Sequence, residues 1–166
     1  MVKSSEWIAG HPETQIESPA PSSWGDRGYW DVWLNGDNAW IYRHLHRAEE
    51  RMVELATTFG APTPQEDRAL TQAGRELLLA QSSDWAFIIS MKTTVPYAVK
   101  RTRLHLANFD RLYHALVDDQ LVEAELGEFE SRSPIFSELD WRVWRRAGGD
   151  TSIGGVATQV LSLIHI

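Results

Sequence analysis

Apolar residues between positions 41 and 59 recur every three or four residues, which is the period of a helix that buries one face. Polar and charged residues fill most of the remaining positions. Asn35, Asp37 or Asn38 can cap the N-terminus of this helix, and Gly60 followed by Pro62 supplies a stop signal. The residues predicted to form the buried face are Ile41, Leu45, Ala48, Met52, Leu55, Ala56 and Phe59.

A second helix is predicted to begin at Pro64, directly after Thr63. Thr63 and Glu66 stand three residues apart, which is the signature of a capping box, and proline is favoured at the first helical position. Ser82 and Ser83 then interrupt the apolar pattern. The predicted buried stripe consists of Ala69, Leu70, Ala73, Leu77 and Ala80.

A short apolar segment and two further helices are predicted beyond this interruption. Asp84 can cap the segment 85–91, and a long helix begins near Thr93 or Thr94 with Pro96 in its first turn. A shorter helix covers 121–130 and ends before Pro134, whereas the mixed stretch 135–146 is consistent with a loop. The long helix is predicted to bury Val95, Val99, Leu106, Phe109, Leu112, Tyr113 and Leu116.

The two ends of the chain lack a helical period. Residues 1–23 contain three prolines among serines and glutamates, which is typical of a loop or an incoming linker. Residues 24–36 combine three glycines with three tryptophans and predict an aromatic loop. Residues 147–166 are predicted to be a disordered tail. Because 161–166 match a translated sequencing-library adaptor, we expect these six residues to be an artefact outside the fold.

Segments of alternating apolar and polar residues, which would indicate strands, do not reach a useful length in this sequence. Long amphipathic helices with short connections instead indicate an all-α fold. We predict an antiparallel bundle of three to four helices with an aromatic-rich N-terminal loop, in a helical domain that spans 24–146.

Composition narrows the classes of function. The net charge of −7 repels phosphate backbones and argues against nucleic acid as a partner. There is no cysteine, no apolar run near the roughly 20 residues of a membrane span, and no apolar signal-peptide core after Met1. We therefore expect a cytoplasmic protein that does not bind a membrane. Eight tryptophans are present, and their apolar faces suit protein cores, interfaces and sugar rings alike.

Three stretches together carry a resemblance to a known family. They are Ser23-Trp24-Gly25-Asp26-Arg27-Gly28-Tyr29 with Val32-Trp33-Leu34-Asn35, then Trp40-Ile41 with Ala48-Glu49-Glu50-Arg51-Met52, and the run from Arg75 through Gln81-Ser82-Ser83-Asp84-Trp85. The segment ending in Asp140-Trp141 adds to it. Residues 20–145 resemble the C-terminal helical region of glycoside hydrolase family 57 1,4-α-glucan branching enzymes.

The resemblance implies a function and a set of substrate-binding residues. In that family an N-terminal (β/α)7 barrel carries the catalytic glutamate and aspartate, and retention of configuration needs two carboxylates about 5–5.5 Å apart. The barrel and its motifs are missing from this sequence, so no catalytic residue is expected in it. The resemblance implies that Trp24, Trp33 and Asp84 contact the α-glucan, amylose or glycogen. The resemblance also places a further glucan contact at Thr93, nine residues after Asp84, where the family often has a glutamine.

Other site chemistries fit the sequence poorly. His44 and His46 cannot chelate one metal ion on a helix, because residues two apart point about 200° away from each other. The run Ser82-Ser83-Asp84 lacks the context of a hydrolase nucleophile, and the arginines around 142–146 are expected to be solvated. No metal and no cofactor is therefore expected. Two rival functions stay open, namely a stand-alone sugar-binding module and a helical protein-interaction domain without a ligand.

Overall fold

The computed structural model describes residues 3–13, 15–25 and 28–146. Every regular element in these ranges is helical, which confirms the all-α prediction. The chain divides into two compact units, residues 1–31 and residues 32–166. Within the described ranges, no helix is long and apolar enough to cross a membrane. The predicted tail 147–166, with its suspected adaptor residues, lies outside the described part.

The first unit contains a short helix, α1 (Ser4–Gly10), where a loop was predicted. The Glu6 carboxylate accepts a hydrogen bond of 3.4 Å from the Lys3 backbone N–H and closes the first turn. The loop prediction missed α1 because the helix buries none of its residues and so carries no apolar period. The aromatic loop also contains a single turn of 3-10 helix, η2 (Trp30–Val32).

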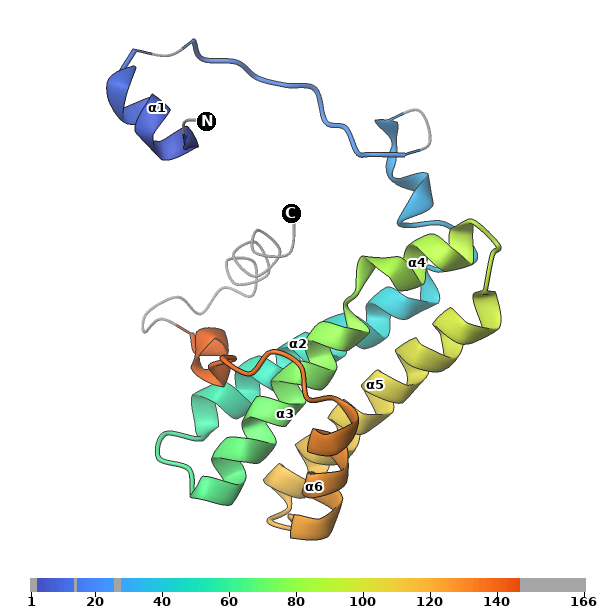
Figure 1. The fold of residues 1–166 in the computed structure, drawn as a ribbon. Helices are drawn as coiled ribbons and strands as arrows, with labels where there is room; N and C mark the ends of the chain where they lie inside the picture. Colours follow the sequence, from blue (N-terminus) through green and yellow to red (C-terminus); the bar gives the residue numbers. More distant parts are fainter. Residues whose placement is uncertain (1–2, 14, 26–27, 147–166) are drawn as a thin grey trace. The chain divides into compact units, whose positions relative to one another are not determined.

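Three long helices form the bundle of the second unit: α2 (Trp40–Thr58), α3 (Pro64–Ala80) and α5 (Val95–Val117). Successive long helices run in opposite directions, and α3 lies beside both α2 and α5 (Figure 1). Two shorter helices complete the unit. Helix α4 (Ser83–Ser90) continues from the end of α3 and packs on α5, and α6 (Glu123–Arg132) packs on the start of α3.

The predicted helix caps are confirmed at one of three positions. The Thr63 hydroxyl accepts from the Glu66 N–H at 3.3 Å, and the Glu66 carboxylate accepts from the Thr63 N–H at 2.6 Å, which is a complete capping box. The cap prediction for α2 was wrong: its N-cap is Ala39, and no side chain accepts a hydrogen bond there. The cap prediction for Asp84 was also wrong, because the N-cap of α4 is Ser82.

Two hydrophobic clusters hold the bundle together. The larger one lies between α2, α3, α5 and α6 and includes Met52 and Leu77, neither of which has exposed surface. The smaller one lies where α2 begins and α3 ends, and joins Ile41 to Ile89 of α4 and Ala98 of α5. Each large apolar side chain buried in this way contributes roughly 1.5–3 kcal/mol before entropic costs. The second cluster anchors α4 to the bundle.

The stretch 135–146, predicted as a loop, contains a 3-10 helix, η3 (Trp141–Trp144), whose two tryptophans are buried. The Trp141 indole N–H donates to Oδ1 of Asp67 in α3 at 3.0 Å. Gly74 of α3 leaves the room that the Trp144 ring occupies: a Cβ at Gly74 would lie 3.0 Å from Cζ3 of that ring. The segment was misassigned because η3 has only four residues, which is too short to show a period.

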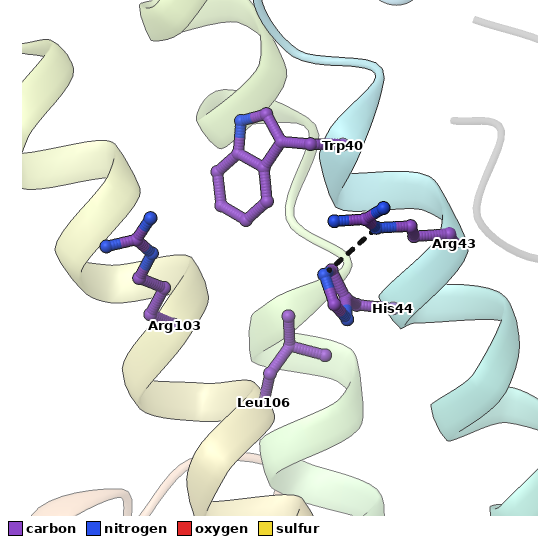
Figure 2. Close-up of a pocket in the computed structure, with 5 residues that line it drawn as sticks. All are labelled: Trp40, Arg43, His44, Arg103 and Leu106. Carbon is purple, nitrogen blue, oxygen red and sulfur yellow. Dashed lines mark hydrogen bonds between the residues drawn. The ribbon is translucent and has the colours of Figure 1, made fainter.

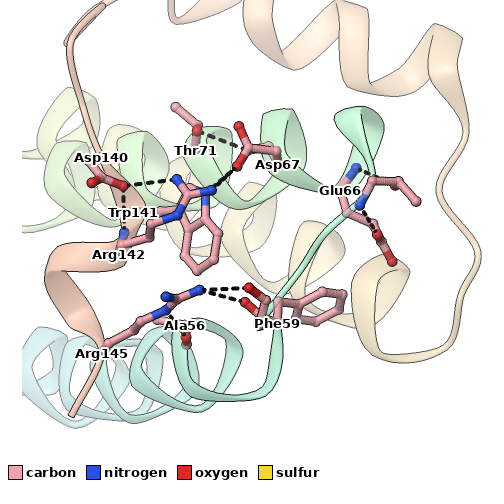
Figure 3. A network of polar contacts seen from close by, with 11 residues as sticks. Ala56, Phe59, Glu66, Asp67, Thr71, Asp140, Trp141, Arg142 and Arg145 are labelled. Atoms are coloured by element: carbon pink, nitrogen blue, oxygen red, sulfur yellow. Dashed lines mark hydrogen bonds and ion pairs between the residues drawn. The ribbon is translucent and has the colours of Figure 1, made fainter. Parts of the chain in front are cut away.

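Two arginines in this segment are tied to the bundle, which corrects the expectation that they are solvated (Figure 3). Arg145 donates to the backbone oxygens of Ala56 and Phe59, at 3.0 and 2.9 Å, at the C-terminal end of α2. Arg142 forms an ion pair of 2.8 Å with Asp67. Because the last carbonyls of a helix lack partners within it, Arg145 acts as a side-chain cap on α2.

Candidate functional site

The loop that carries Trp33 is fastened to α4 through a buried asparagine. The Asn38 side chain has no exposed surface, and its amide donates to the Ser90 hydroxyl at 3.0 Å and to the Val32 carbonyl at 3.2 Å. The Asn35 amide donates to the same Ser90 hydroxyl at 2.8 Å. A buried amide with several good hydrogen bonds has few alternative placements. Residues 32–38 are therefore held rigidly against the end of α4.

Trp33 lies half-buried against α4. Its ring centroid is 6.0 Å from that of Phe87 at an interplanar angle of 36°, and the Tyr42 hydroxyl donates to its backbone oxygen. The ring thus packs on α4, and the backbone of Trp33 is held by α2. A half-buried indole with fixed orientation can offer its remaining surface to a ligand at little entropic cost.

Asp84 lies exposed in the first turn of α4, where the Ser82 hydroxyl donates to its Oδ2 at 2.8 Å. Residues three apart on a helix share a face, so Asp84 is one turn before Phe87 on the same side of α4. Trp33 packs against that Phe87. Two of the four predicted contacts, Trp33 and Asp84, therefore belong to the surroundings of one short helix.

Thr93 is exposed in the connection between α4 and α5. Asp84 stands at the start of α4 and Thr93 follows its end, and eight helical residues rise about 12 Å. The structure therefore does not bring Thr93 and Asp84 together at one point. Lys92, which has a positive φ of 56°, pairs with Asp37 and ties this connection to the loop 32–38.

Trp24 belongs to the first unit, whereas the other three predicted residues belong to the second. Its side chain is 72% exposed. It precedes Gly25, whose φ of 103° favours glycine, and the Ser23 N–H donates to the Gly28 carbonyl at 2.8 Å. The tight turn keeps the indole on the surface of its unit.

A buried charged network between α3 and α5 escaped the sequence reasoning. The Glu76 carboxylate has no exposed surface; it accepts at Oε2 from His105 Nδ1 at 2.7 Å and from the Asn108 amide at 3.1 Å. The Gln72 amide donates to Oε1 at 3.0 Å. Burial alone would raise the pKa of Glu76, but these hydrogen bonds and the His105 charge hold the pKa below its usual value.

A weak signal for this network was present in the sequence. Gln72 and Glu76 are four residues apart and lie beside Ala69 and Ala73 of the predicted buried stripe. A helix packed on several sides buries a wider arc than its apolar stripe. Since the network has no surface contact, a substrate cannot reach it, and its role is to hold α3 against α5.

Metal chemistry finds no support among the described residues, where no cluster of three histidine or acidic side chains could hold an ion. His44 and His46 are both exposed on α2. One open hollow of about 360 Å³ is lined by residues of α2 and α5. It lies outside the set of predicted contacts.

The chain matches known proteins along most of its length. The family model for the C-terminal part of 1,4-alpha-glucan branching enzymes matches residues 44–144. A 1,4-alpha-glucan branching enzyme of Thermococcus kodakarensis is 34% identical over 128 residues, which is 77% of this chain but 18% of that enzyme. A probable 1,4-alpha-glucan branching enzyme of Mycobacterium tuberculosis is 34% identical over 98 residues, 54% of this chain and again 18% of the relative.

Solved structures share the helical architecture. The alpha-amylase AmyC from Thermotoga maritima is 44% identical with a TM-score of 0.70, over 88% of this chain and 26% of that one. The GH57-type branching enzyme from Pyrococcus horikoshii is 28% identical with a TM-score of 0.74, over 86% of this chain and 28% of that one. The present chain thus spans between 18% and 28% of the length of these relatives. It belongs to the family of 1,4-alpha-glucan branching enzymes of the GH57 type, of which it represents the C-terminal helical domain.

Proposed function

We propose that this chain is the glucan-binding helical domain of a retaining branching enzyme, and that it forms one wall of a cleft whose catalytic residues lie in a (β/α)7 barrel. The observation that supports this most strongly is the fastening of the loop 32–38 to α4. Buried Asn38 joins the loop to α4, so that Trp33 and Asp84 stand on one fastened surface. Preorganised positioning residues are what a cleft for a long, flexible polymer requires.

The two side chains suit complementary parts of a glucose unit. An indole packs against the apolar C–H face of the ring, and an exposed carboxylate accepts hydrogen bonds from ring hydroxyls. Neither group reacts, so both act by positioning the glucan relative to the catalytic pair. Trp24 and Thr93 are assigned to the same cleft through the family resemblance, with amylose or glycogen as the glucan and the cytoplasm as the compartment.

The surface around α4 also fits contact with a further domain. Leu34, Met91 and Tyr97 are each about half exposed, and they lie in the loop 32–38, after α4 and at the start of α5. Exposed apolar side chains gathered at one end of a domain mark an interaction surface. We assign that surface to packing against the barrel.

The test is a chimera in which residues 20–146 replace the matching region of the Thermococcus kodakarensis enzyme. Trp24→Ala, Trp33→Ala and Asp84→Asn are each expected to lower branching activity by about tenfold, because each removes a positioning contact. Activity is measured by loss of iodine staining of amylose, alongside Tm. The matched control is Asp118→Asn at the opposite end of α5, which should keep full activity.

The stability readout separates binding from folding. Asp84→Asn should leave Tm nearly unchanged, because the carboxylate is exposed and is not the cap of α4. If all three variants keep full activity per folded molecule, the cleft assignment is wrong. Loss of Tm with unchanged specific activity would point to a structural role instead.

A further inference from the structure

The open hollow between α2 and α5 is lined by basic and apolar side chains, although the protein as a whole is acidic. It is lined by Trp40, Arg43 and His44 from α2 and by Arg103 and Leu106 from α5, and its volume is about 360 Å³ (Figure 2). The Arg103 guanidinium lies 5.6 Å from the centre of the Trp40 ring. Two guanidinium groups from different helices thus flank one aromatic wall.

The polar groups in this hollow are donors. Arg43 Nε donates to His44 Nε2 at 3.3 Å, which occupies the imidazole lone pair and leaves the Nδ1–H as a donor. Arginine side chains and the Trp40 indole have no acceptor. A neutral sugar needs acceptors for its hydroxyl groups, as Asp84 would provide elsewhere. The hollow therefore favours a ligand that brings its own acceptors and negative charge.

Acidic residues are missing from both helix segments that face the hollow. Residues 40–48 of α2 and 95–109 of α5 contain no aspartate or glutamate, but together contain Arg43, Arg47, Lys100, Arg101 and Arg103. The net charge of the chain is −7, so this local excess of positive charge stands out. Among these five cations, Arg47 pairs with Glu50, which stands just outside the first segment. Asp110, just after the second segment, pairs with Arg51.

Arg43 and Arg103 are not neutralised within the described part of the chain. Their contacts are with His44 and with the Trp40 ring, and no carboxylate of the described residues lies within 4 Å of either guanidinium. Two like charges that share one hollow repel each other, and a bound anion relieves that repulsion. Arginine also matches the geometry of phosphate oxygens with paired N–H groups.

From these observations we infer that the hollow binds a small phosphomonoester, with the phosphate between Arg43 and Arg103 and the organic part against Trp40 and Leu106. A volume of about 360 Å³ exceeds what one inorganic anion fills and matches a small organic ligand. The site uses none of the predicted glucan contacts. It is therefore independent of the proposed glucan cleft.

The experiment is a titration of the 15N-labelled chain with glucose 6-phosphate, glucose and inorganic phosphate at constant ionic strength. The indole N–H signal of Trp40, assigned with Trp40→Phe, reports directly on the hollow. We expect a saturable shift with glucose 6-phosphate at concentrations up to about 10 mM, since an open site holds a small ligand weakly. Glucose should cause no shift, and inorganic phosphate should bind more weakly.

The variants Arg43→Gln and Arg103→Gln should each weaken glucose 6-phosphate binding by about tenfold, because each removes one guanidinium group and its paired N–H donors. Arg47→Gln is the matched control: it makes the same change of charge on α2 but pairs with Glu50 outside the hollow. Absence of a saturable Trp40 shift, equal weakening by Arg47→Gln, or equal affinity for inorganic phosphate would each overturn the inference. Circular dichroism checks that the variants, which change exposed side chains, remain folded.

Discussion

A carboxylate without exposed surface is stable in its charged form only where donors surround it. Glu76 has three such donors, from His105, Asn108 and Gln72, and they come from both α3 and α5. Removing the Glu76 carboxylate leaves the buried His105 and Asn108 side chains without this acceptor. At the scale of single residues, this network should therefore be the most sensitive point of the bundle.

The first prediction concerns Glu76→Gln, which keeps the size of the side chain but replaces one acceptor with a donor. The new amide would face the Asn108 or Gln72 amide, so we expect a loss of about 3 kcal/mol in the free energy of unfolding. Urea denaturation of both proteins measures it. The control Glu50→Gln alters an exposed ion pair and should change stability by less than about 0.5 kcal/mol. Equal effects of the two variants would contradict the network's role.

The same residue predicts a pH dependence. The pKa of Glu76 is lowered on folding, so its charged form stabilises the folded state fully above the unfolded value of 4.5. That contribution is lost as the pH falls from 4.5 through the lower pKa of the folded state. Tm of the natural protein should therefore fall in this range more steeply than Tm of Glu76→Gln. Parallel curves for the two proteins would be evidence against the prediction.

At the scale of elements, η3 fixes the end of the described chain to two helices. The Arg145 guanidinium donates hydrogen bonds to backbone oxygens at the end of α2, which have no N–H partner within the helix. Trp141 and Trp144 fill the space beside α3 that Gly74 leaves open. A segment of twelve residues without strong local preference is thus structured by its contacts.

The second element-scale feature to test is the cap on α2. Arg145→Ala should lower the free energy of unfolding by about 1 kcal/mol, since the guanidinium is partly solvated and water replaces some of its hydrogen bonds. This corresponds to a fall in Tm of about 4 °C. Arg146→Ala, one residue later, removes the same charge and should leave Tm within about 1 °C. Calorimetry of both variants distinguishes the cap from a general effect of charge.

Replacing a glycine with alanine should change the stability of the protein in opposite directions in α3 and in α6. Gly127→Ala in α6 should raise stability by about 0.5–1 kcal/mol, because no atom lies within 4 Å of the new methyl group. Gly74→Ala should lower stability by about 1 kcal/mol net, because its methyl group would press on the buried Trp144 ring and on Leu139. If thermal unfolding shows both variants stabilised, the packing of η3 on α3 is looser than the structure shows.

At the scale of the whole molecule, the proposed function assigns glucan binding to this chain and the catalytic residues to another domain. Retaining glycoside chemistry needs a carboxylate pair about 5–5.5 Å apart across a bound sugar. In the described residues, the one buried carboxylate with a perturbed environment is Glu76, which is enclosed by α3 and α5. Several of the exposed acidic side chains are engaged in surface ion pairs, such as Glu50 with Arg47.

The 166-residue chain by itself should therefore show no branching or hydrolysis of amylose. The measurement is the loss of iodine staining together with the release of new reducing ends, against a control without protein. The chimera with a catalytic domain serves as the positive control. Activity of the isolated chain above background would mean that it carries a catalytic pair of its own.

Local patterns in the sequence were enough to determine the helices whose signals are local. The period of three and four in α2, α3 and α5, and the Thr63–Glu66 capping box, depend on residues within one or two turns of each other. Motif matching likewise identified the family from short runs of residues. The predicted positions of Trp24, Trp33, Asp84 and Thr93 in the glucan cleft still await a test.

Only the tertiary structure decided the features that join distant residues. Glu76 and His105 are 29 positions apart, and Trp141 and Asp67 are 74 apart, so no periodic pattern could reveal either contact. The cap predicted at Asn38 failed for the same reason, because its side-chain amide bonds Val32 and Ser90 and does not cap α2. Burial makes an unpaired polar group costly, and partners that satisfy it are chosen by proximity in space rather than along the chain.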